Sequence, residues 1–114
     1  MYKILFHVDD KDQIDHAIGN VLGVSKDMED AGDQFQIEVV ANGTGVFAFT
    51  EDANENIKRI KSFLKDGIKI AVCRNSLTKF EIEDNELIDG INIVATAVGE
   101  LVRKQANGWA YIKL

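Results

Sequence analysis

The chain has 114 residues, of which 46% are hydrophobic and 28% are charged. This composition is typical of a folded protein and excludes a disordered one, and the length predicts a single domain over residues 1–114. The formal net charge is −6, and the Lys and Arg residues are scattered along the chain. Nucleic acids and anionic membrane surfaces both require clustered positive charge, so we expect neither as a partner.

The sequence also bears on the location of the protein. No apolar run approaches the roughly 20 residues that a membrane helix requires, and the first residues lack the apolar segment of a signal peptide. Cys73 is the single cysteine, so no internal disulfide can form. These features predict a cytoplasmic protein.

In chain order, five short apolar runs rich in β-branched and aromatic residues predict strands. They cover residues 4–8, 35–41, 68–73, 91–95 and 109–113. Segments with apolar residues at helical spacing separate these runs. They cover residues 14–28, 57–64, 76–89 and 98–107, and the third of them is broken.

This alternation of strands and helices predicts an α/β fold. We expect a five-stranded, mainly parallel sheet with right-handed crossovers and helices on both faces, in a flavodoxin-like three-layer sandwich. The expected strand order is 2-1-3-4-5. The first and third runs are the most uniformly apolar, as central strands covered on both faces require, so we place them side by side.

The loops that follow parallel strands share one rim of the sheet, where ligands bind in open α/β proteins. Cys73 ends the third run and precedes a helix start, whose free N–H groups favour the thiolate over the thiol. The neighbouring Arg74 lowers the pKa of a thiol further if its guanidinium points the same way. The residues expected on this rim are His7, Asn42, Gly43, Gly45, Cys73, Arg74, Asn75 and Ser76.

Several of these residues also have an interpretation without chemistry. A free cysteine is most often a small buried apolar residue, and the Gly43-x-Gly45 element fits simple chain reversal. His7 is either a proton carrier or a partly exposed, hydrogen-bonded side chain. Phe47 and Phe49 are either core residues or an oligomer contact. One cysteine and one rim histidine are too few for a metal site, and no cofactor motif is complete, so we predict neither metal nor cofactor.

Several segments resemble one known family. They are residues 7–9 (HVD), 37–46 (IEVVANGTGV) and 71–77 (AVCRNSL), continued by residues 100–103, 105 and 108–112. In this order and spacing, the sequence resembles small single-domain proteins of the DsrE/DsrF-like family. The resemblance implies a sulfur-relay role, in which sulfane sulfur is held as a persulfide on Cys73 and passed to a partner protein. It also implies a homo-oligomer, such as a trimer or hexamer, or a hetero-oligomer with a homologous subunit.

The leading hypothesis is therefore a sulfur carrier with a protein donor and a protein acceptor. In this hypothesis Cys73 accepts and releases the sulfur, His7 moves a proton, and Asn75 orients the sulfur. One alternative is a non-catalytic oligomeric binding module of the same fold, in which Cys73 is inert. Another is a small-molecule site between subunits, built from the Gly43 loop and His7. The residues expected to bind substrate or partner are Arg74, Asn75, Ser76, Asn42, Gly43 and Gly45.

Overall fold

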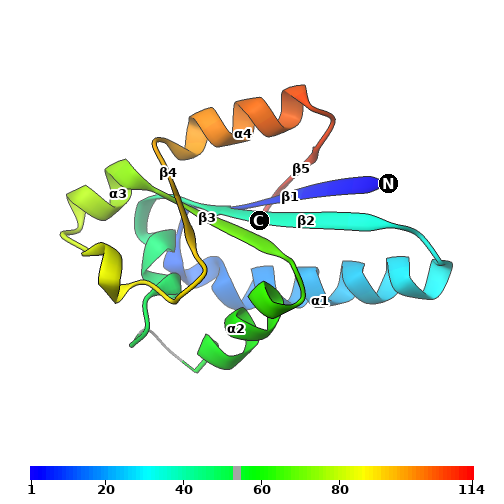
Figure 1. The fold of residues 1–114 in the computed structure, drawn as a ribbon, viewed down its shortest axis with the longest axis horizontal. Helices are drawn as coiled ribbons and strands as arrows, with labels where there is room; N and C mark the ends of the chain where they lie inside the picture. Colours follow the sequence, from blue (N-terminus) through cyan, green and yellow to red (C-terminus); the bar gives the residue numbers. More distant parts are fainter. Residues whose placement is uncertain (53–54) are drawn as a thin grey trace.

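A five-stranded sheet, parallel throughout, forms the middle of the computed structural model (Figure 1). The structure describes residues 1–52 and 55–114. Every apolar run of the sequence forms a strand, with bounds close to those expected. The strands are β1 (Tyr2–Val8), β2 (Phe35–Ala41), β3 (Lys69–Cys73), β4 (Asn92–Val94) and β5 (Ala110–Lys113).

Helices connect these strands along the described part of the chain. The broken third helical segment consists of a short α-helix and a 3-10 helix, and a further 3-10 helix after β2 is not predicted by the sequence pattern. The α-helices are α1 (Ile14–Ala31), α2 (Ile57–Lys65), α3 (Arg74–Lys79) and α4 (Ala97–Ala106). The 3-10 helices are η1 (Lys11–Gln13), η2 (Gly43–Phe49) and η3 (Asp84–Glu86).

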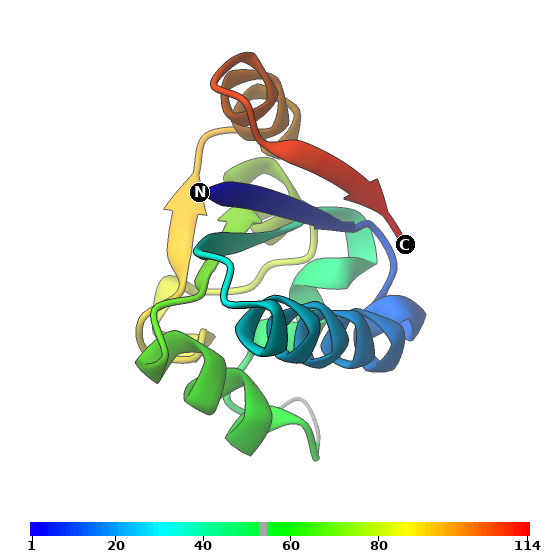
Figure 2. The ribbon, with the colours of Figure 1, turned by 90° about the vertical axis from the view of Figure 1, so that its right-hand side faces the viewer.

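The helices lie on both sides of the sheet, with α1 and α2 on one face and α4 on the other (Figures 1 and 2). This arrangement follows from right-handed crossovers between parallel strands. The chain steps from β1 to β2, β3 and β4 in one direction, which keeps α1 and α2 on one face. It then returns to the opposite edge to form β5, and the return places α4 on the other face. The predicted three-layer α/β fold is thus confirmed.

The expected strand order 2-1-3-4-5 is wrong, because the observed order is β4-β3-β2-β1-β5. β2 is the middle strand, and β5 pairs with β1 rather than with β4. The reason lies in β2, which carries Glu38 and therefore looks less like a doubly covered strand than β1 or β3. Glu38 is nevertheless only 2% exposed, because it lies beneath α4.

Two hydrophobic clusters hold the layers together, one on each face of the sheet. The larger includes Phe6 of β1, Ile70 of β3 and Phe49 of η2, packed with α1 and α2. Burying a side chain of this size contributes about 1.5–3 kcal/mol. The smaller cluster lies beneath α4 and consists of Leu5, Val40, Ala71, Cys73, Ala97, Leu101 and Trp109. The side chain of Cys73 therefore faces α4.

The two phenylalanines of η2 have different environments. Phe49 is 1% exposed and belongs to the larger cluster, so it is a core residue. Phe47 is 36% exposed, and its ring packs against Phe80 with centroids 5.0 Å apart. η2, which begins just after β2, thus covers one end of the larger cluster.

Candidate functional site

Cys73 lies where two connections leave the sheet in opposite directions. It is the last residue of β3, it precedes α3 directly, and it pairs with Val94 at the end of β4. Leu77 of α3 enters the larger cluster, whereas Ala97 and Leu101 of α4 enter the smaller one on the other face. Open α/β sheets form their ligand sites at such a divergence.

Four hydrogen-bond donors converge on the sulfur of Cys73. Burial by itself raises the pKa of the Cys73 thiol. The backbone N–H groups of Ser76, Ala97 and Asn75, together with the Ser76 hydroxyl, donate to the sulfur and bring the pKa below its ordinary value. These N–H groups lie in the first turns of α3 and α4, where backbone donors lack an intrahelical partner. The arrangement stabilises a thiolate.

The Ser76 hydroxyl also connects α3 to the loop that follows β2. Its oxygen accepts a hydrogen bond from the backbone N–H of Gly43 at 2.8 Å. Gly43 has a φ of 55°, and a Cβ at this position would lie 2.8 Å from the carbonyl oxygen of Asp9. A Cβ at Gly45 would lie 2.6 Å from the carbonyl oxygen of Val8. Both glycines therefore allow the loop to pass close to the end of β1.

His7 bridges two other strands on the face of the sheet that α4 covers. Its Nε2 lies 2.9 Å from Oδ1 of Asn42, and its Nδ1 lies 2.7 Å from the hydroxyl oxygen of Tyr111 on β5. The register of β2 on β3 pairs Ala41 with Val72, so the residues that follow them, Asn42 and Cys73, lie next to each other at the ends of their strands. A row of side chains thus runs along the rim from Cys73 through Asn42 and His7 to Tyr111. The sequence does not predict Tyr111 at this site, because the expected strand order places β5 far from β1.

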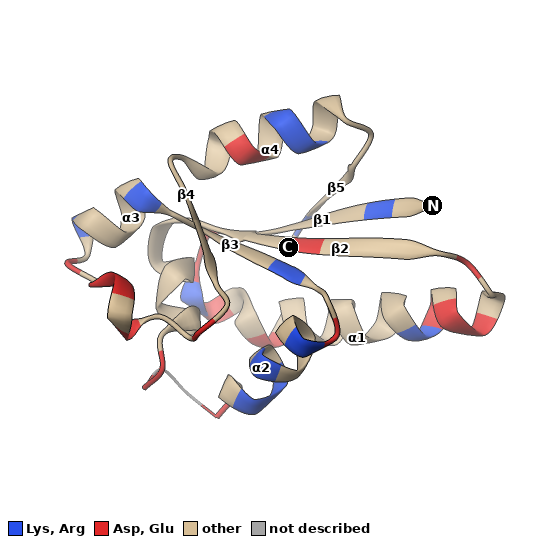
Figure 3. Cartoon of the chain, in the orientation of Figure 1, with Lys and Arg blue, Asp and Glu red and all other residues tan. Residues whose placement is uncertain are grey.

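The Arg74 guanidinium forms an ion pair with η3 and not with Cys73. It donates to both carboxylate oxygens of Asp84 in η3, at 2.7 and 3.0 Å. This hydrogen bonding raises the pKa of Arg74 and lowers that of Asp84. Figure 3 shows the basic start of α3 and the acidic η3 at the same end of the molecule. The charge of Arg74 is thus compensated by Asp84.

A second exposed ion pair lies beside His7. Lys113 Nζ is 2.6 Å from Oδ2 of Asp9, and this hydrogen bond lowers the pKa of Asp9. Lys113 is also the register partner of His7 on β5. The pair joins the loop after β1 to the last strand and closes this end of the rim.

A buried acid that is not among the residues expected on the rim lies beneath α4. Glu38 is 2% exposed, and burial raises its pKa to about 7, with a further contribution from a hydrogen bond to Glu100. Lys104 Nζ is 3.8 Å from the Glu38 carboxylate, which is too long for a hydrogen bond, and its charge does not offset the burial. The feature of the sequence that points to this buried acid is a single glutamate inside the apolar run 35–41.

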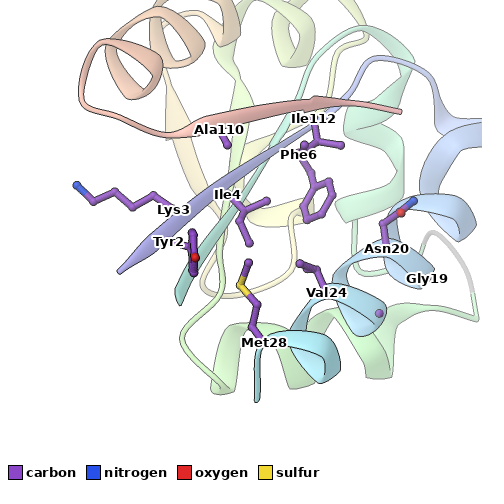
Figure 4. A pocket seen from close by; sticks show the side chains of 11 residues that line it. Tyr2, Lys3, Ile4, Phe6, Gly19, Asn20, Val24, Met28, Ala110 and Ile112 are labelled. Carbon is purple, nitrogen blue, oxygen red and sulfur yellow. The ribbon is translucent and has the colours of Figure 1, made fainter. Parts of the chain in front are cut away.

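An apolar groove lies on the opposite face of the sheet, between α1 and the edge formed by β1 and β5 (Figure 4). It encloses about 460 Å³, and its lining includes Ile4, Phe6, Val24 and Ile112, with Asn20 as a polar side chain from α1. No Cys, His, Asp or Glu is among the lining residues. The groove is therefore separate from the rim that holds Cys73.

Within residues 1–52 and 55–114, no group of three or more His, Cys, Asp or Glu side chains is placed to hold a metal ion. In that same part of the chain, no helix combines the length and the apolar character needed to cross a membrane. The absence of a cofactor stays a prediction.

Three comparisons relate the chain to known proteins. The model of the DsrE/DsrF-like family matches residues 6–114. The solved structure of a protein of unknown function, MTH1491 from Methanobacterium thermoautotrophicum, is 30% identical, with 100% of both chains covered and a TM-score of 0.91. The ychN protein from E. coli is 11% identical, with 100% of both chains covered and a TM-score of 0.70, and this likeness shows the fold alone. The comparison with curated proteins gives no match.

Proposed function

Because this chain belongs to the DsrE/DsrF-like family, which is associated with sulfur relay, we propose that it carries sulfane sulfur as a persulfide on Cys73. The observation that carries this proposal is the convergence of three backbone N–H groups and the Ser76 hydroxyl on one sulfur atom. A cysteine that only fills a core needs no such donors, and its burial would leave the thiol pKa raised.

The proposed chemistry consists of two exchange reactions. In loading, the Cys73 thiolate attacks the outer sulfur of a donor persulfide, R–S–SH. A bond forms between Cys73 Sγ and that sulfur, the S–S bond of the donor breaks, and the donor leaves as the thiolate R–S⁻. In transfer, an acceptor thiolate attacks the outer sulfur of Cys73–S–SH, and Cys73 leaves as a thiolate. Neither step needs an oxidant, since each consumes one thiolate and produces one.

The hydrogen bonds around the sulfur serve both reactions. A lowered pKa increases the thiolate fraction during loading and makes Cys73 a better leaving group during transfer. Asn75 and Ser76 hold the sulfur, and Gly43 fixes the Ser76 hydroxyl in place. Gly45 allows the loop to approach β1, so that it supports the site without touching the sulfur.

The remaining rim residues are suited to binding. Asn42 lies beside Cys73, and His7 lies one strand further along the rim, so both are suited to contact an incoming donor or acceptor. The exposed pair of Arg74 and Asp84 flanks the other side of Cys73 and is suited to contact a protein donor or acceptor. We place this relay in the cytoplasm, where thiols are kept reduced.

We further propose that the protein assembles with copies of itself, as a trimer or hexamer, or with a homologous subunit. Val98 and Val102 on the outer side of α4 are 64% and 60% exposed. Tyr2 and Ile112, near the β1–β5 edge, are 56% and 41% exposed. Exposed apolar side chains of this size are typical of contact surfaces.

A second candidate function is a non-catalytic oligomeric binding module in which Cys73 is inert. The observation that favours it is the burial of Cys73, which is 6% exposed and packs in one cluster with Leu5 and Trp109. Under this alternative, the thiol is a packing residue that reagents reach only when the fold opens.

Intact-mass spectrometry of the native protein after treatment with inorganic polysulfide separates the two candidates. We expect the wild type to gain one reducible sulfur atom and the Cys73→Ser variant to gain none, with the same circular dichroism spectrum for both. Native alkylation by iodoacetamide supplies the second readout. A wild type that gains no sulfur, and whose thiol is alkylated only after denaturation, contradicts the carrier and supports the binding module.

A further inference from the structure

We infer that Tyr111, His7 and Asn42 form a positioning chain that turns the amide N–H₂ group of Asn42 toward the outer sulfur atom carried by Cys73. The inference rests on the proposed function and deepens it, because it names the residue that binds the transferred atom. It also changes the role expected of His7, from a proton carrier at the sulfur to a residue that orients Asn42.

The three side chains come from adjacent strands and touch in sequence. The Tyr111 hydroxyl of β5 is 2.7 Å from His7 Nδ1 on β1, and His7 Nε2 is 2.9 Å from Oδ1 of Asn42 at the end of β2. β5, β1, β2 and β3 are neighbours in the sheet in that order, so the chain of contacts leads along the rim to Cys73.

The chemistry of these groups fixes the direction of each hydrogen bond. A carboxamide oxygen only accepts hydrogen bonds, so His7 Nε2 carries a proton and donates it to Oδ1 of Asn42. In the neutral imidazole, Nδ1 is then the acceptor, and the Tyr111 hydroxyl donates to it. The carboxamide of Asn42 thus has its oxygen on the β1 side. Its nitrogen is the other branch of the carboxamide, and β3 with Cys73 lies on the side of β2 away from β1.

An amide N–H donor beside Cys73 serves to bind the outer sulfur atom of the persulfide. The Sγ atom of Cys73 already receives bonds from the first turns of α3 and α4 and from Ser76. The outer atom of a persulfide lies beyond Sγ and needs a donor of its own. An amide N–H that donates to this atom favours its anionic form, Cys73–S–S⁻, which thiolates attack poorly because both carry negative charge. The sulfur is therefore retained until a proton arrives with the acceptor.

The Tyr111 hydroxyl decides which nitrogen of the neutral ring carries the proton. Without it, the neutral ring is free to carry its proton on Nδ1, and Nε2 then accepts. Asn42 has to rotate to donate to Nε2, which turns its oxygen toward the anionic sulfur. The imidazolium form carries protons on both nitrogens and donates from Nε2 in either case. The charged groups beside the ring are Asp9 and Lys113, which are paired with each other at 2.6 Å.

The test compares the lifetime of the loaded sulfur in wild type and in Tyr111→Phe. Both proteins are loaded with inorganic polysulfide, and loss of sulfur to a small thiol is followed by intact-mass spectrometry. The measurements are made at about pH 5.5 and about pH 8.5, on either side of the range in which imidazole side chains titrate. We expect Tyr111→Phe to lose its sulfur about fivefold faster than wild type at the higher pH and at the same rate at the lower pH.

Two variants and one spectrum control this experiment. Asn42→Ala removes the donor itself, and we expect faster loss at both pH values. Ser62→Ala removes a hydroxyl from the exposed side of α2, and we expect the wild-type lifetime at both. Two-bond ¹H–¹⁵N correlation spectra of the unloaded proteins report the histidine tautomer, with His16→Gln used to assign the two rings. We expect His7 to be protonated at Nε2 in wild type and to become a mixture of tautomers in Tyr111→Phe.

The outcomes separate this inference from the proposed function. A wild type that takes up no sulfur overturns the proposed function and this inference with it. A wild type that loads, beside a Tyr111→Phe variant with an unchanged lifetime at both pH values, overturns the inference alone. Equal acceleration at both pH values also overturns it, because a merely structural role of Tyr111 does not depend on the protonation of His7.

Discussion

The hydroxyl of Ser76 joins the sulfur of Cys73 to the loop that follows β2. Its oxygen accepts the N–H of Gly43 at 2.8 Å, and its proton is donated to the sulfur of the residue three positions earlier. Because the bond from Gly43 uses one lone pair of the oxygen, it limits the directions in which the hydroxyl proton can point. Ser76 thus transmits the conformation of the loop to the thiol.

Replacing Ser76 by alanine should make Cys73 less reactive. The variant loses the hydroxyl hydrogen bond to the thiolate, so the pKa of the Cys73 thiol rises. We expect native alkylation by iodoacetamide at neutral pH to slow by about three- to tenfold, since a more basic thiolate is also more nucleophilic and recovers part of the loss. Ser62→Ala on the exposed side of α2 is the matched control. An unchanged rate in Ser76→Ala would show that the hydroxyl does not stabilise the thiolate.

The N-terminal cap of α4 should affect both the free energy of unfolding and the alkylation rate of the Cys73 thiol. Thr96 Oγ1 accepts the backbone N–H of Gly99 at 2.9 Å, and the next residue, Ala97, gives its N–H to Cys73. Thr96→Ala should lower the free energy of unfolding by about 1 kcal/mol. Its alkylation rate should fall about twofold or more, because the Ala97 N–H is less well fixed.

The conservative variant separates the two effects of the cap. Thr96→Ser keeps the hydroxyl, so we expect wild-type stability in urea unfolding and a wild-type alkylation rate. A Thr96→Ala variant that is destabilised but alkylated at the wild-type rate would mean that the thiolate does not depend on the α4 cap.

Position 43 should require glycine for two reasons: the chain passes close to the Asp9 carbonyl oxygen there, and the backbone is in the left-handed region. Gly43→Ala places a Cβ 2.8 Å from the Asp9 carbonyl oxygen at a φ of 55°. We expect a loss of about 2–4 kcal/mol in the free energy of unfolding, from the left-handed conformation and the overpacking together. Gly32→Ala is the control, because Gly32 has a φ of 77° and nothing lies within 4 Å of its added Cβ.

The two glycine variants are compared by urea denaturation. Gly32→Ala should lose only the conformational part, about 1–2 kcal/mol. Equal losses in both variants would show that the loop after β2 can move away from β1, and that the distance to Asp9 does not constrain it.

The alternation of apolar runs with helical segments predicts the elements, because local sequence decides them. The order of the strands depends on which runs are buried on both faces, and here one residue misleads. Glu38 makes β2 look peripheral, although α4 covers this glutamate and leaves it 2% exposed. A single glutamate inside an apolar run is compatible both with a buried acid and with a strand that has one face exposed to solvent.

The strand order also decides what the sequence can say of the site. Cys73 at a strand end is evident from its local pattern, as are the helix start and the neighbouring Ser76. With order 2-1-3-4-5, His7 would lie next to Cys73 and Asn42 one strand further away. In the observed order Asn42 lies between them, and β5 brings Tyr111 to His7. Contacts between strands that are far apart in the sequence could not be derived from local patterns.

Glu38 should make the stability of the protein depend on pH. Oε1 of Glu38 is buried without a donor among the described residues, and a proton between Glu38 and Glu100 supplies the missing hydrogen bond. The pKa of Glu38 is raised to about 7 in the folded protein by burial and by this bond. The unfolded chain releases the proton at an ordinary glutamate pKa, so the folded state binds more protons in the window between the two values.

The sign of the effect follows from this excess of bound protons. Stability is highest below the unfolded pKa and falls as the pH rises through about 7, with a total loss of about 3 kcal/mol. Glu38→Gln keeps the shape of the side chain and its ability to donate to Glu100, but it has no proton to release. In urea unfolding between about pH 5 and about pH 9, the variant should therefore lose less stability than wild type and be the more stable protein at the alkaline end.

Glu29→Gln on the exposed side of α1 is the control, and its stability should parallel that of wild type. Subtracting the Glu38→Gln curve from the wild-type curve isolates the contribution of Glu38, because the other titratable groups are present in both proteins. A difference that does not change with pH would mean that Glu38 is already ionised in the fold, and that Lys104 at 3.8 Å compensates its burial after all.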